Sequence, residues 1–556
     1  MSSTLGGHGS SRHNKDLYSR KEFPDKGSEG RFGRLFPISE SGDDDESLRP
    51  HPSPRFDLER LGEFGGPMTL ADGAEGQQDS HSPAGVTFLG QFVDHDITLD
   101  VQSKFEKPEI NVSLENARTP NLDLDCVYGG GREASPHLYK GPYLIEGELT
   151  KPEDAAKTAD LPRNTENRAI IGDPRNDENV MVAQVQSAFL RFHNRCVDVL
   201  FENDKSLSDE ELFEQARDTT THFYHRVVLE DMLYRMVGFE MIQDISVRGR
   251  KYYFPKGFWK KNRIPEKPFM PVEFSVAAYR FGHSQIRDTY KLNAAIDPIA
   301  VFLPRSEDPD DQTPTLRGFD KLPENYRLDW NNFFNIPGSD KSPASAFKVD
   351  PFLPKPLLEL PTGIVGEGDP VVSLASRNLV RGRTFRLPSG ESIARRMQSD
   401  GNLVGHDEDS NRILDLSDPE TATHPAIRDL MKKLRTSYAM TETPLWLYIL
   451  MEAAEFGDGF DPDTRGSGGG DRLGPVGGRI VAEVLMGLLD HYRDMSGKGL
   501  DYSPKVPYNL SSTVDTKKVT IVETVYGPRM TMGSFVQFAY GEALSYHALE
   551  RNQVSA

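Results

Sequence analysis

Three side chains suited to acid–base chemistry stand close together near the end of the first hundred residues. Gln91, Asp94 and His95 are spaced i, i+3 and i+4, so a helix would place them on one face. They offer a hydrogen-bond donor, a carboxylate and an imidazole that titrates near neutrality. Asp96 would point about 100° further round the helix axis. The segment Gly90–Thr98 therefore predicts a helix that presents a base to one cavity and an oxygen ligand to another. A buried helix with a hydrogen-bonded histidine is the structural alternative.

A second pattern has an oxygen-bearing side chain at every second position: Thr119, Asn121, Asp123 and Asp125. In an extended segment, this period would turn all four toward one side. Calcium takes about six to eight oxygen ligands, including carboxylates and carbonyls, so the loop is a candidate site for a hard cation. A solvated polar edge is the structural alternative, and the loop lacks the central glycine of an EF-hand.

Three further segments carry reactive or ligating residues: Gly172–Glu178, Tyr279–His283 and Ser376–Arg381. Arg175 lies near the start of a predicted helix, where the helix dipole disfavours a cation, and this suggests an anionic partner. His283 follows a glycine, where a bulky group could approach the backbone. Asn378 and Arg381 are spaced i, i+3 and would share a helix face. Each segment taken alone is also compatible with a structural role.

Helical periodicity predicts the elements that would position these residues. Residues 180–200 carry an apolar stripe at three- and four-residue spacing, in which His193 is expected to be a hydrogen-bonded core histidine. A second amphipathic helix is predicted from about Ser208 to Val237. Val519–Val525 is the clearest candidate strand, and residues 304–345, rich in Pro, Asp and Asn, predict a long surface excursion. Shorter helices are predicted near residues 368–382, 391–398, 424–436 and 476–492.

The composition of the 556 residues is that of a globular protein, with 27% charged side chains and a formal net charge of −20. This charge argues against nucleic acid and anionic membranes as partners, and no apolar run is long enough to span a bilayer. Residues 1–30 predict a disordered arm without a secretory signal, so we expect a cytoplasmic protein, with non-classical secretion as the alternative. Cys126 and Cys196 are the only cysteines, which excludes a disulfide framework. The apolar cluster Phe32–Pro37 is expected to dock on the body.

The order and content of the five motifs resemble those of the animal-type haem peroxidases, within the peroxidase–cyclooxygenase superfamily that includes myeloperoxidase and lactoperoxidase. The chain is most similar to bacterial-type members without a signal peptide, and the resemblance runs from about Phe32 to the end. It implies a mainly α fold: a single large helical domain over residues 31–556 that encloses a buried haem, with few short β-strands.

The resemblance also implies roles for the catalytic side chains. His95 is similar to the distal histidine, the base that takes a proton from peroxide and returns it to the leaving oxygen. Arg175 is similar to the distal arginine, whose cation would stabilise charge as the O–O bond breaks. Gln91 resembles the distal glutamine, which hydrogen-bonds water and helps to place a halide.

Five residues match positions that bind haem in the family. His283 is similar to the proximal iron ligand, and Asn378 to the partner that orients this ligand and tunes its basicity. Arg381 corresponds to an arginine that pairs with a haem propionate. Asp94 and Glu178 stand where the mammalian enzymes form ester bonds to haem methyl groups, so the resemblance implies haem b that is covalently attached through them.

The alternating loop matches a calcium site of the family. The resemblance implies that calcium is held by Asp96, Thr119, Asn121 through its carbonyl, Asp123 and Asp125. Calcium would thereby fix the helix that carries the base, which explains why a redox site carries a redox-inert ion. The last of these residues is a serine in the mammalian enzymes, so this site is expected to be more anionic.

Two departures from the family pattern limit what the resemblance implies. Asn179 stands where myeloperoxidase has the methionine that forms a sulfonium link to haem, so this third bond should be absent, and with it part of the oxidising power that chloride requires. The usual Arg-Asp-His-Gly is replaced by Arg383-Thr384-Phe385-Arg386, which puts contacts on the propionate side in doubt.

The implied function is that of a peroxidase, which reduces hydrogen peroxide and oxidises bromide, iodide, thiocyanate or phenols through a ferryl intermediate. A role in the response to oxidative stress is expected. A fatty-acid dioxygenase of the same superfamily is an alternative, but it needs a tyrosine three residues before the proximal histidine. Arg280 occupies that position, and Tyr279 is one residue off. A peroxide-inert haem protein and a haem-free calcium-binding or adhesion module are further alternatives. The sequence leaves the oligomeric state open.

Overall fold

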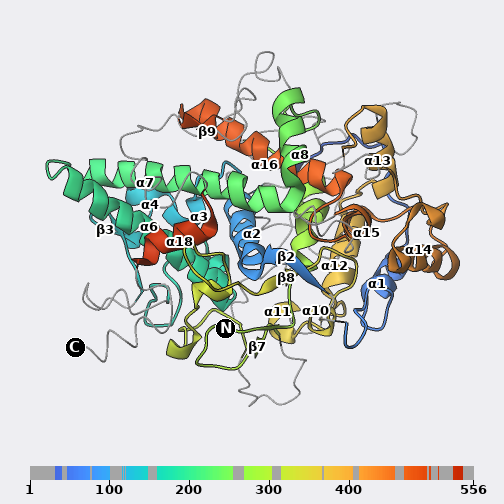
Figure 1. Cartoon of the computed structure of the whole chain (residues 1–556), viewed down its shortest axis with the longest axis horizontal. Helices are drawn as coiled ribbons and strands as arrows, with labels where there is room; N and C mark the ends of the chain where they lie inside the picture. Colours follow the sequence, from blue (N-terminus) through green and yellow to red (C-terminus); the bar gives the residue numbers. More distant parts are fainter. Residues whose placement is uncertain are drawn as a thin grey trace.

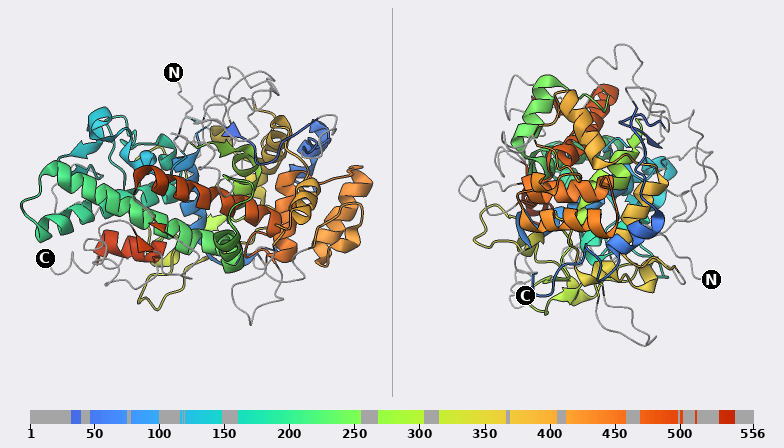
Figure 2. Two further views of the ribbon diagram at one scale, coloured as in Figure 1. Left: turned by 90° about the horizontal axis from the view of Figure 1, so that it is seen from above. Right: turned by 90° about the vertical axis from the view of Figure 1, so that its right-hand side faces the viewer.

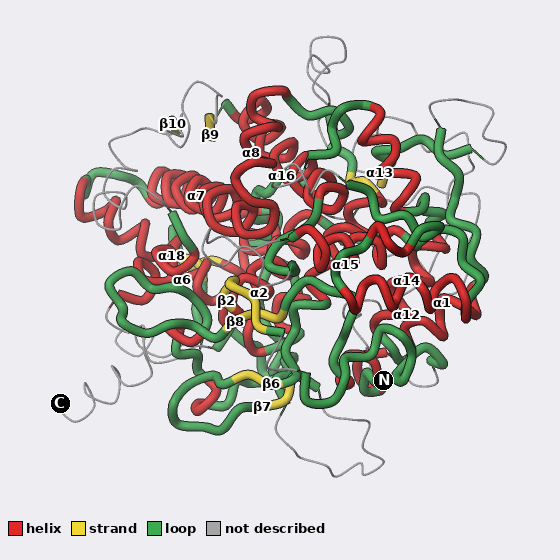
Figure 3. The backbone as a smooth tube through the Cα atoms, turned by 45° about the vertical axis from the view of Figure 1, so that its right-hand side comes forward, coloured by secondary structure: helices red, strands yellow, loops and turns green. Residues whose placement is uncertain are grey.

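Helices dominate the computed structural model, and the strands are few and short (Figure 3). The structure describes residues 32–39, 47–74, 78–99, 116, 118, 120–147, 160–254, 268–302, 315–365, 369–404, 412–457, 469–497, 500–501, 511–512 and 530–541. The predicted N-terminal arm (1–30) and the candidate strand Val519–Val525 lie outside these residues. Within them, no helix combines the length and the apolar character needed to cross a bilayer.

The longer α-helices account for most of the described chain. They are α1 (Arg55–Gly62), α2 (Ala84–Ile97), α6 (Val180–Asn203), α7 (Asp209–Arg226), α8 (Tyr234–Arg248), α12 (Leu374–Thr384), α13 (Gly390–Ser399), α14 (Pro425–Ser437), α15 (Leu445–Phe456), α16 (Pro475–Ser496) and α18 (Met532–Tyr540). Four single-turn helices are α3 (Asp125–Tyr128), α4 (Gly131–Ala134), α10 (Lys355–Leu358) and α11 (Thr362–Val365).

The described strands form five separate two-stranded pairs. β1 (Phe32–Gly33) pairs in parallel with β5 (Met270–Pro271), so the predicted docking of the N-terminal apolar cluster is confirmed. The other pairs are antiparallel: β2 (Asp79–Pro83) with β8 (Ser345–Phe347), β3 (Tyr139–Lys140) with β4 (Tyr143–Leu144), β6 (Thr289–Tyr290) with β7 (Ile299–Ala300), and β9 (Leu500–Asp501) with β10 (Ser511–Ser512). The mainly α prediction is therefore confirmed.

The helices surround α2, which lies near the middle of the molecule (Figure 1). α6 packs against α2, α7 and α18, while α16 packs against α8 and α15. Figure 1 and the left view of Figure 2 place α14 and the α6–α7 pair at opposite ends of the long axis. Buried apolar side chains from all these helices form one continuous cluster, so α2 is held in place from several sides.

Local sequence signals explain where the two longest predicted helices begin. The Asn179 side chain accepts a hydrogen bond from the Val182 N–H and caps α6. Ser208 and Glu211 form a capping box at the start of α7. The predicted helix to Val237 continues beyond α7 as a π-helical segment, η4 (Val227–Leu233), and then α8. Gly238, with φ 77°, kinks α8.

The predicted surface excursion at residues 304–345 is wrong for the described part, residues 315–345. Trp330, Phe333 and Phe334 are each 2% exposed or less. Gly85, in the first turn of α2, lies so close to this segment that a Cβ atom would be 2.5 Å from the Phe333 carbonyl oxygen and from the Phe334 ring. The prediction failed because the segment is polar overall, whereas its three buried aromatic residues pack it beneath α2.

Candidate active site

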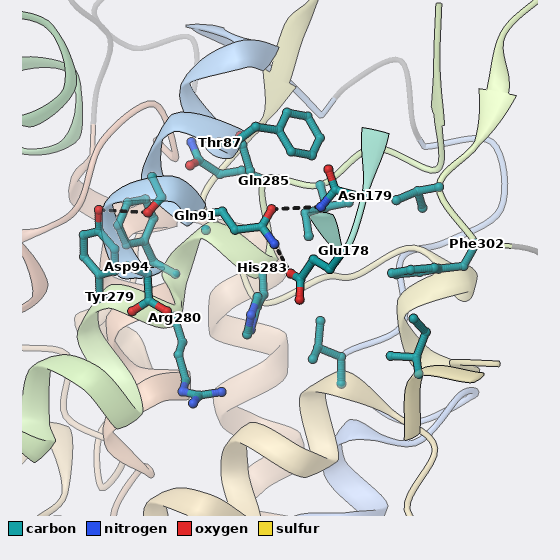
Figure 4. A pocket seen from close by; sticks show the side chains of 18 of the residues that line it. Thr87, Gln91, Asp94, Glu178, Asn179, Tyr279, Arg280, His283, Gln285 and Phe302 are labelled. Atoms are coloured by element: carbon teal, nitrogen blue, oxygen red, sulfur yellow. Dashed lines mark hydrogen bonds between the residues drawn. The ribbon is translucent and has the colours of Figure 1, made fainter. Parts of the chain in front are cut away.

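A cavity separates α2 from the segment that carries His283 (Figure 4). Gln91 and Asp94 line it from α2, and Glu178 lines it from the turn before α6. His283 lies at the end of η6 (Ala278–His283), a 3₁₀ segment that follows the π-helical η5 (Glu273–Ala277). Irregular helical turns of this kind are frequent at functional sites. The cavity thus brings together residues from three of the predicted motifs.

His283 has the surroundings that an iron ligand requires. The ring is buried, and its Nδ1 lies 2.8 Å from Nδ2 of Asn378 on α12. Ligation by this imidazole would therefore use Nε2. A Cβ atom placed on Gly282 would meet no atom of the described residues within 4 Å, so there is room beside the ring for a bulky group. The residues present fit a haem.

Arg280 is a partner of Asn378 that sequence reasoning did not assign. Its Nη1 donates to the Asn378 Oδ1 at 3.1 Å, and its Nε donates to the Ser275 carbonyl oxygen at 3.0 Å. A metal-bound imidazole carries its proton on Nδ1 and must donate it, and the amide oxygen is the natural acceptor. Arg280 and a metal-bound His283 would therefore compete for the same oxygen of Asn378.

His95 is fully buried, and an asparagine orients its ring. Nδ1 lies 2.7 Å from Oδ1 of Asn176, whose Nδ2 donates to Oε1 of Gln186 at 2.8 Å. Because Oδ1 can only accept, Nδ1 carries the proton and Nε2 holds the lone pair of a base. Nε2 lies 3.9 Å from Oε1 of Glu178. Sequence reasoning missed Asn176, although it follows Arg175 directly.

Gln91 is part of a hydrogen-bonded chain at the rim of the cavity. Its Nε2 donates to Oε1 of Glu178, and its Oε1 accepts from Nδ2 of Asn179 at 3.1 Å (Figure 4). Asn179, which the resemblance equates with the methionine of myeloperoxidase, lines the cavity and holds the glutamine. In the view of Figure 4, Asp94 and Glu178 lie on opposite sides of His283.

The anionic partner expected for Arg175 is Asp173. Nη2 of Arg175 lies 2.8 Å from Oδ2 of Asp173, and Nε lies 3.2 Å from both carboxylate oxygens. Nη2 also donates to the carbonyl oxygens of His95 at 2.9 Å and Thr98 at 2.7 Å. Arg175 and His95 are not among the residues that line the cavity. The arginine instead ties its segment to the end of α2.

Arg381 shares α12 with Asn378, as predicted, but is not among the cavity-lining residues. Its guanidinium lies 5.1 Å from the centre of the Phe385 ring. In the segment that departs from the family pattern, Arg383 donates to the Ser53 carbonyl oxygen at 3.2 Å. The Phe385 carbonyl oxygen accepts from Arg34 at 2.5 Å. The segment therefore contacts the N-terminal part of the chain.

Asp96 points away from this cavity, as predicted, toward a second site. Its carboxylate and those of Asp123 and Asp125 offer oxygens that all lie within 4.8 Å of one another. Asp96 is fully buried; Oδ2 accepts from Tyr224 and Leu124, whereas Oδ1 makes no hydrogen bond within the part of the chain that the structure describes. An all-oxygen cluster with a buried oxygen of this kind fits a hard cation.

Burial and mutual repulsion explain the electrostatics of this cluster. Burial, with the charges of Asp125 and Asp123, raises the pKa of Asp96 well above its usual value. Burial and the charge of Asp125 raise the pKa of Asp123 to about 7. When all three carboxylates are charged, burial and mutual repulsion destabilise them, and a divalent cation would offset this destabilisation.

The loop that contains Asn121, Asp123 and Asp125 is not extended, so the predicted extended conformation is wrong. The prediction that Asp123 and Asp125 lie together is confirmed. Leu122 and Leu124 have φ values of 52° and 60°, in the left-handed region. Such a conformation persists in non-glycine residues only where surrounding contacts hold it. His225 Nε2 lies 2.8 Å from the Leu122 carbonyl oxygen, and His491 Nδ1 contacts Oδ1 of Asn121. Thr119 lies outside the described residues.

Comparisons with known proteins show which proteins this chain resembles. The family model for animal haem peroxidases matches residues 112–389. Chorion peroxidase of Drosophila melanogaster is 27% identical over 184 residues, which cover 31% of this chain and 22% of that protein. The chain thus matches less than a third of this relative's length.

Two solved structures share the fold. Peroxidase A of Dictyostelium discoideum has a TM-score of 0.57 at 14% identity, covering 96% of this chain and 98% of that one. A fatty acid alpha-dioxygenase of Oryza sativa has a TM-score of 0.52 at 15% identity, covering 98% and 87%. The fold therefore occurs in both peroxidases and dioxygenases.

Proposed function

The chain belongs to the animal haem peroxidase family, and on this premise we propose that it is a haem-dependent peroxidase. It would reduce hydrogen peroxide and oxidise small donors such as bromide, iodide, thiocyanate or phenols. The observation that carries the proposal is the cavity between α2 and His283, with an oriented imidazole on the η6 side and carboxylate and amide groups on the α2 side.

In this proposal haem supplies the redox-active iron, and the chain supplies ligation, orientation and proton transfer. Nε2 of His283 would hold the iron, and Asn378 would orient the ring through Nδ1. Arg381 is assigned to a propionate. Asp94 and Glu178 are assigned to ester bonds with the haem, a proposal supported by their places on either side of His283 in Figure 4.

His95 moves the proton. Nε2 accepts a proton from hydrogen peroxide and returns it to the departing oxygen, while Asn176 keeps the other proton on Nδ1. Arg175 supplies positive charge beside the base and fixes the His95 carbonyl. Gln91 holds the water or halide at the rim. Because Asn179 cannot form a sulfonium bond, bromide, iodide, thiocyanate and phenols are proposed in preference to chloride.

We assign calcium to Asp96, Thr119, the Asn121 carbonyl, Asp123 and Asp125. The proposal is supported by the grouped carboxylates and by the buried Asp96 oxygen. Asp96 follows His95 directly, so a cation held there would fix the end of α2 and with it the base.

The test is an absorption spectrum of the purified protein supplied with haem, before and after one equivalent of hydrogen peroxide. We expect a Soret band that shifts within milliseconds and recovers when iodide or a phenol is added. A Soret band that ignores peroxide would point to a peroxide-inert haem protein. The absence of a Soret band would favour a haem-free calcium-binding module.

A fatty-acid dioxygenase is the second candidate, because the fold also occurs in the Oryza sativa enzyme. The position three residues before His283 holds Arg280, and the hydroxyl of the neighbouring Tyr279 donates to the Gly90 carbonyl oxygen at 3.2 Å. We therefore expect no oxygen uptake when palmitate is added without peroxide. Oxygen uptake under these conditions would favour the dioxygenase.

A further inference from the structure

Arg118 lies between the carboxylate cluster and the segment that carries Arg175. Its Nη1 lies 3.2 Å from Oδ1 of Asp125. On the other side, its Nη2 lies 2.5 Å and its Nε 3.0 Å from Oδ2 of Asp173. The side chain is 11% exposed, so these contacts are weakly screened by solvent. One planar guanidinium thus bridges two carboxylates that belong to different sites.

Asp173 carries this contact onward to the base. The carboxylate is 1% exposed and binds Arg175, which donates in turn to the His95 carbonyl oxygen. Burial would raise the pKa of Asp173, but the charges of Arg175 and Arg118 outweigh burial and hold this pKa below its usual value. Asp173 is therefore charged in the folded protein and connects the two arginines.

These contacts close a ring around the end of α2. They run from Asp125 through Arg118, Asp173 and Arg175 to the His95 carbonyl, and the next residue, Asp96, belongs to the carboxylate cluster with Asp125. When all groups are ionised, four carboxylates and two guanidinium groups leave a formal charge of −2: Asp96, Asp123, Asp125 and Asp173 against Arg118 and Arg175. One divalent cation would balance this charge.

We propose that Arg118 is a positioning residue that couples cation binding at Asp96, Asp123 and Asp125 to the placement of Arg175 beside His95. Without a cation, Arg118 is shared between Asp125 and Asp173, and the negative charge of the cluster weakens its hold on Asp173. With the cation bound, Arg118 is released to hold Asp173, and Asp173 holds Arg175. The inference rests on the proposed calcium and haem sites and adds a link between them.

The test measures this coupling as a ratio of dissociation constants. Cyanide binding to the ferric, haem-loaded protein is followed by the Soret shift, with calcium and after treatment with a chelator. Hydrogen cyanide loses a proton as it binds, so its affinity reports on the base and on nearby positive charge. We expect calcium to tighten cyanide binding at least about fivefold in the parent, and to change it less than twofold in Arg118→Gln.

The matched control is Arg163→Gln. Arg163 is also a buried arginine that bridges two aspartates, Asp160 and Asp177, and it holds the same turn before α6 without touching the cluster. This variant should keep the calcium effect of the parent. Should Arg118→Gln fail to fold, Arg118→Lys decides, because a single ammonium group cannot bridge both carboxylates and should also lose the effect.

The outcomes separate this inference from the proposed function. A Soret band and peroxide reactivity with equal calcium effects in the parent and Arg118→Gln would overturn the coupling alone. Loss of calcium binding in Arg118→Gln, measured by calorimetry, would also overturn it, because Arg118 would then belong to the cation site itself. A parent protein without calcium effect would overturn it as well, and absence of a Soret band would remove both proposals.

Discussion

At the scale of single residues, the orientation of His95 decides whether the site can act as a base. Asn176 fixes the proton on Nδ1 and leaves Nε2 as the basic nitrogen. This orientation fits the proton transfer that we propose for His95, whereas haem binding is assigned to His283.

We predict that His95→Ala retains haem but reacts with hydrogen peroxide about 10²–10⁴-fold more slowly, the usual effect of losing a general base. Stopped-flow absorbance at the Soret band measures this rate. The control is His81→Ala, since His81 lies on β2 and bonds to Asp471 outside the cavity. A parent rate in His95→Ala would refute the assignment of the distal base.

The paired carboxylates lead to a second prediction at this scale. Asp94→Val combined with Glu178→Gln should allow acidified organic solvent to extract haem that the parent retains, because neither new side chain can form an ester. Mass spectrometry of the extracted protein measures the haem that stays attached. Equal extraction from parent and variant would show that no ester bonds form.

At the scale of secondary-structure elements, α2 depends on close contact with the segment beneath it. Gly85→Ala should destabilise the protein by about 1–3 kcal/mol, because the added Cβ would lie 2.5 Å from a backbone oxygen. Gly90→Ala in the same helix is the matched control: among the described residues, its Cβ would meet only Met236 at 3.5 Å and the Tyr279 hydroxyl at 3.8 Å. This control should be neutral or gain up to about 1 kcal/mol from helix propensity. Denaturant unfolding measures both, and equal effects would contradict the packing argument.

The junction of α15 and α16 predicts a pH dependence. Glu452 on α15 accepts hydrogen bonds from the N–H groups of Val476 and Gly477 at the start of α16. Burial raises the pKa of Glu452 to about 8 in spite of these bonds. Between pH 5 and 8, roughly, the folded state then binds a proton that the unfolded state has released, so this group's contribution to stability falls as pH rises.

In Glu452→Gln the melting temperature should therefore fall less steeply as pH rises through this range, because glutamine has the shape of the glutamate side chain but cannot ionise. Glu359→Gln, a partly exposed residue after α10, is the control and should leave the slope unchanged. An unchanged slope in Glu452→Gln would mean that other groups set the pH dependence.

At the scale of the whole molecule, the carboxylate cluster joins parts of the chain that are far apart in sequence. Asp96 comes from α2 and contacts Tyr224 of α7, while the loop before α3 contacts His225 of α7 and His491 of α16. A cation there would tie these helices together, and its binding energy would add to the stability of the fold.

Calcium removal should therefore lower the melting temperature of the parent protein. Calcium at a hundred times its dissociation constant should raise the free energy of unfolding of the calcium-free protein by about 2.7 kcal/mol. Asp96→Ala should bind less calcium in elemental analysis and lose this response. An undiminished calcium content in that variant would exclude Asp96 as a ligand.

The sequence alone determined the local features. Apolar stripes predicted α6 and the long helix that begins with α7, and the predicted helices near 368–382, 391–398, 424–436 and 476–492 correspond to α12, α13, α14 and α16. His193 is a hydrogen-bonded core histidine as expected. α15 and α18 were missed, because their almost uniformly apolar sequences show little helical periodicity. The spacing of Gln91, Asp94 and Asp96 correctly predicted a helix, α2, with two of these residues at the cavity and Asp96 at the carboxylate cluster. The two sites that this helix would serve stay a prediction.

Only the tertiary structure decided which partners these residues meet. The contacts of His95 with Asn176, of Arg280 with Asn378 and of Arg118 with two aspartates join positions that no local pattern relates. The left-handed turns at Leu122 and Leu124 also depend on helices from distant parts of the chain. Periodicity reports which face of an element is buried, whereas hydrogen bonds between elements depend on how those faces pack, and packing is settled only in the complete fold.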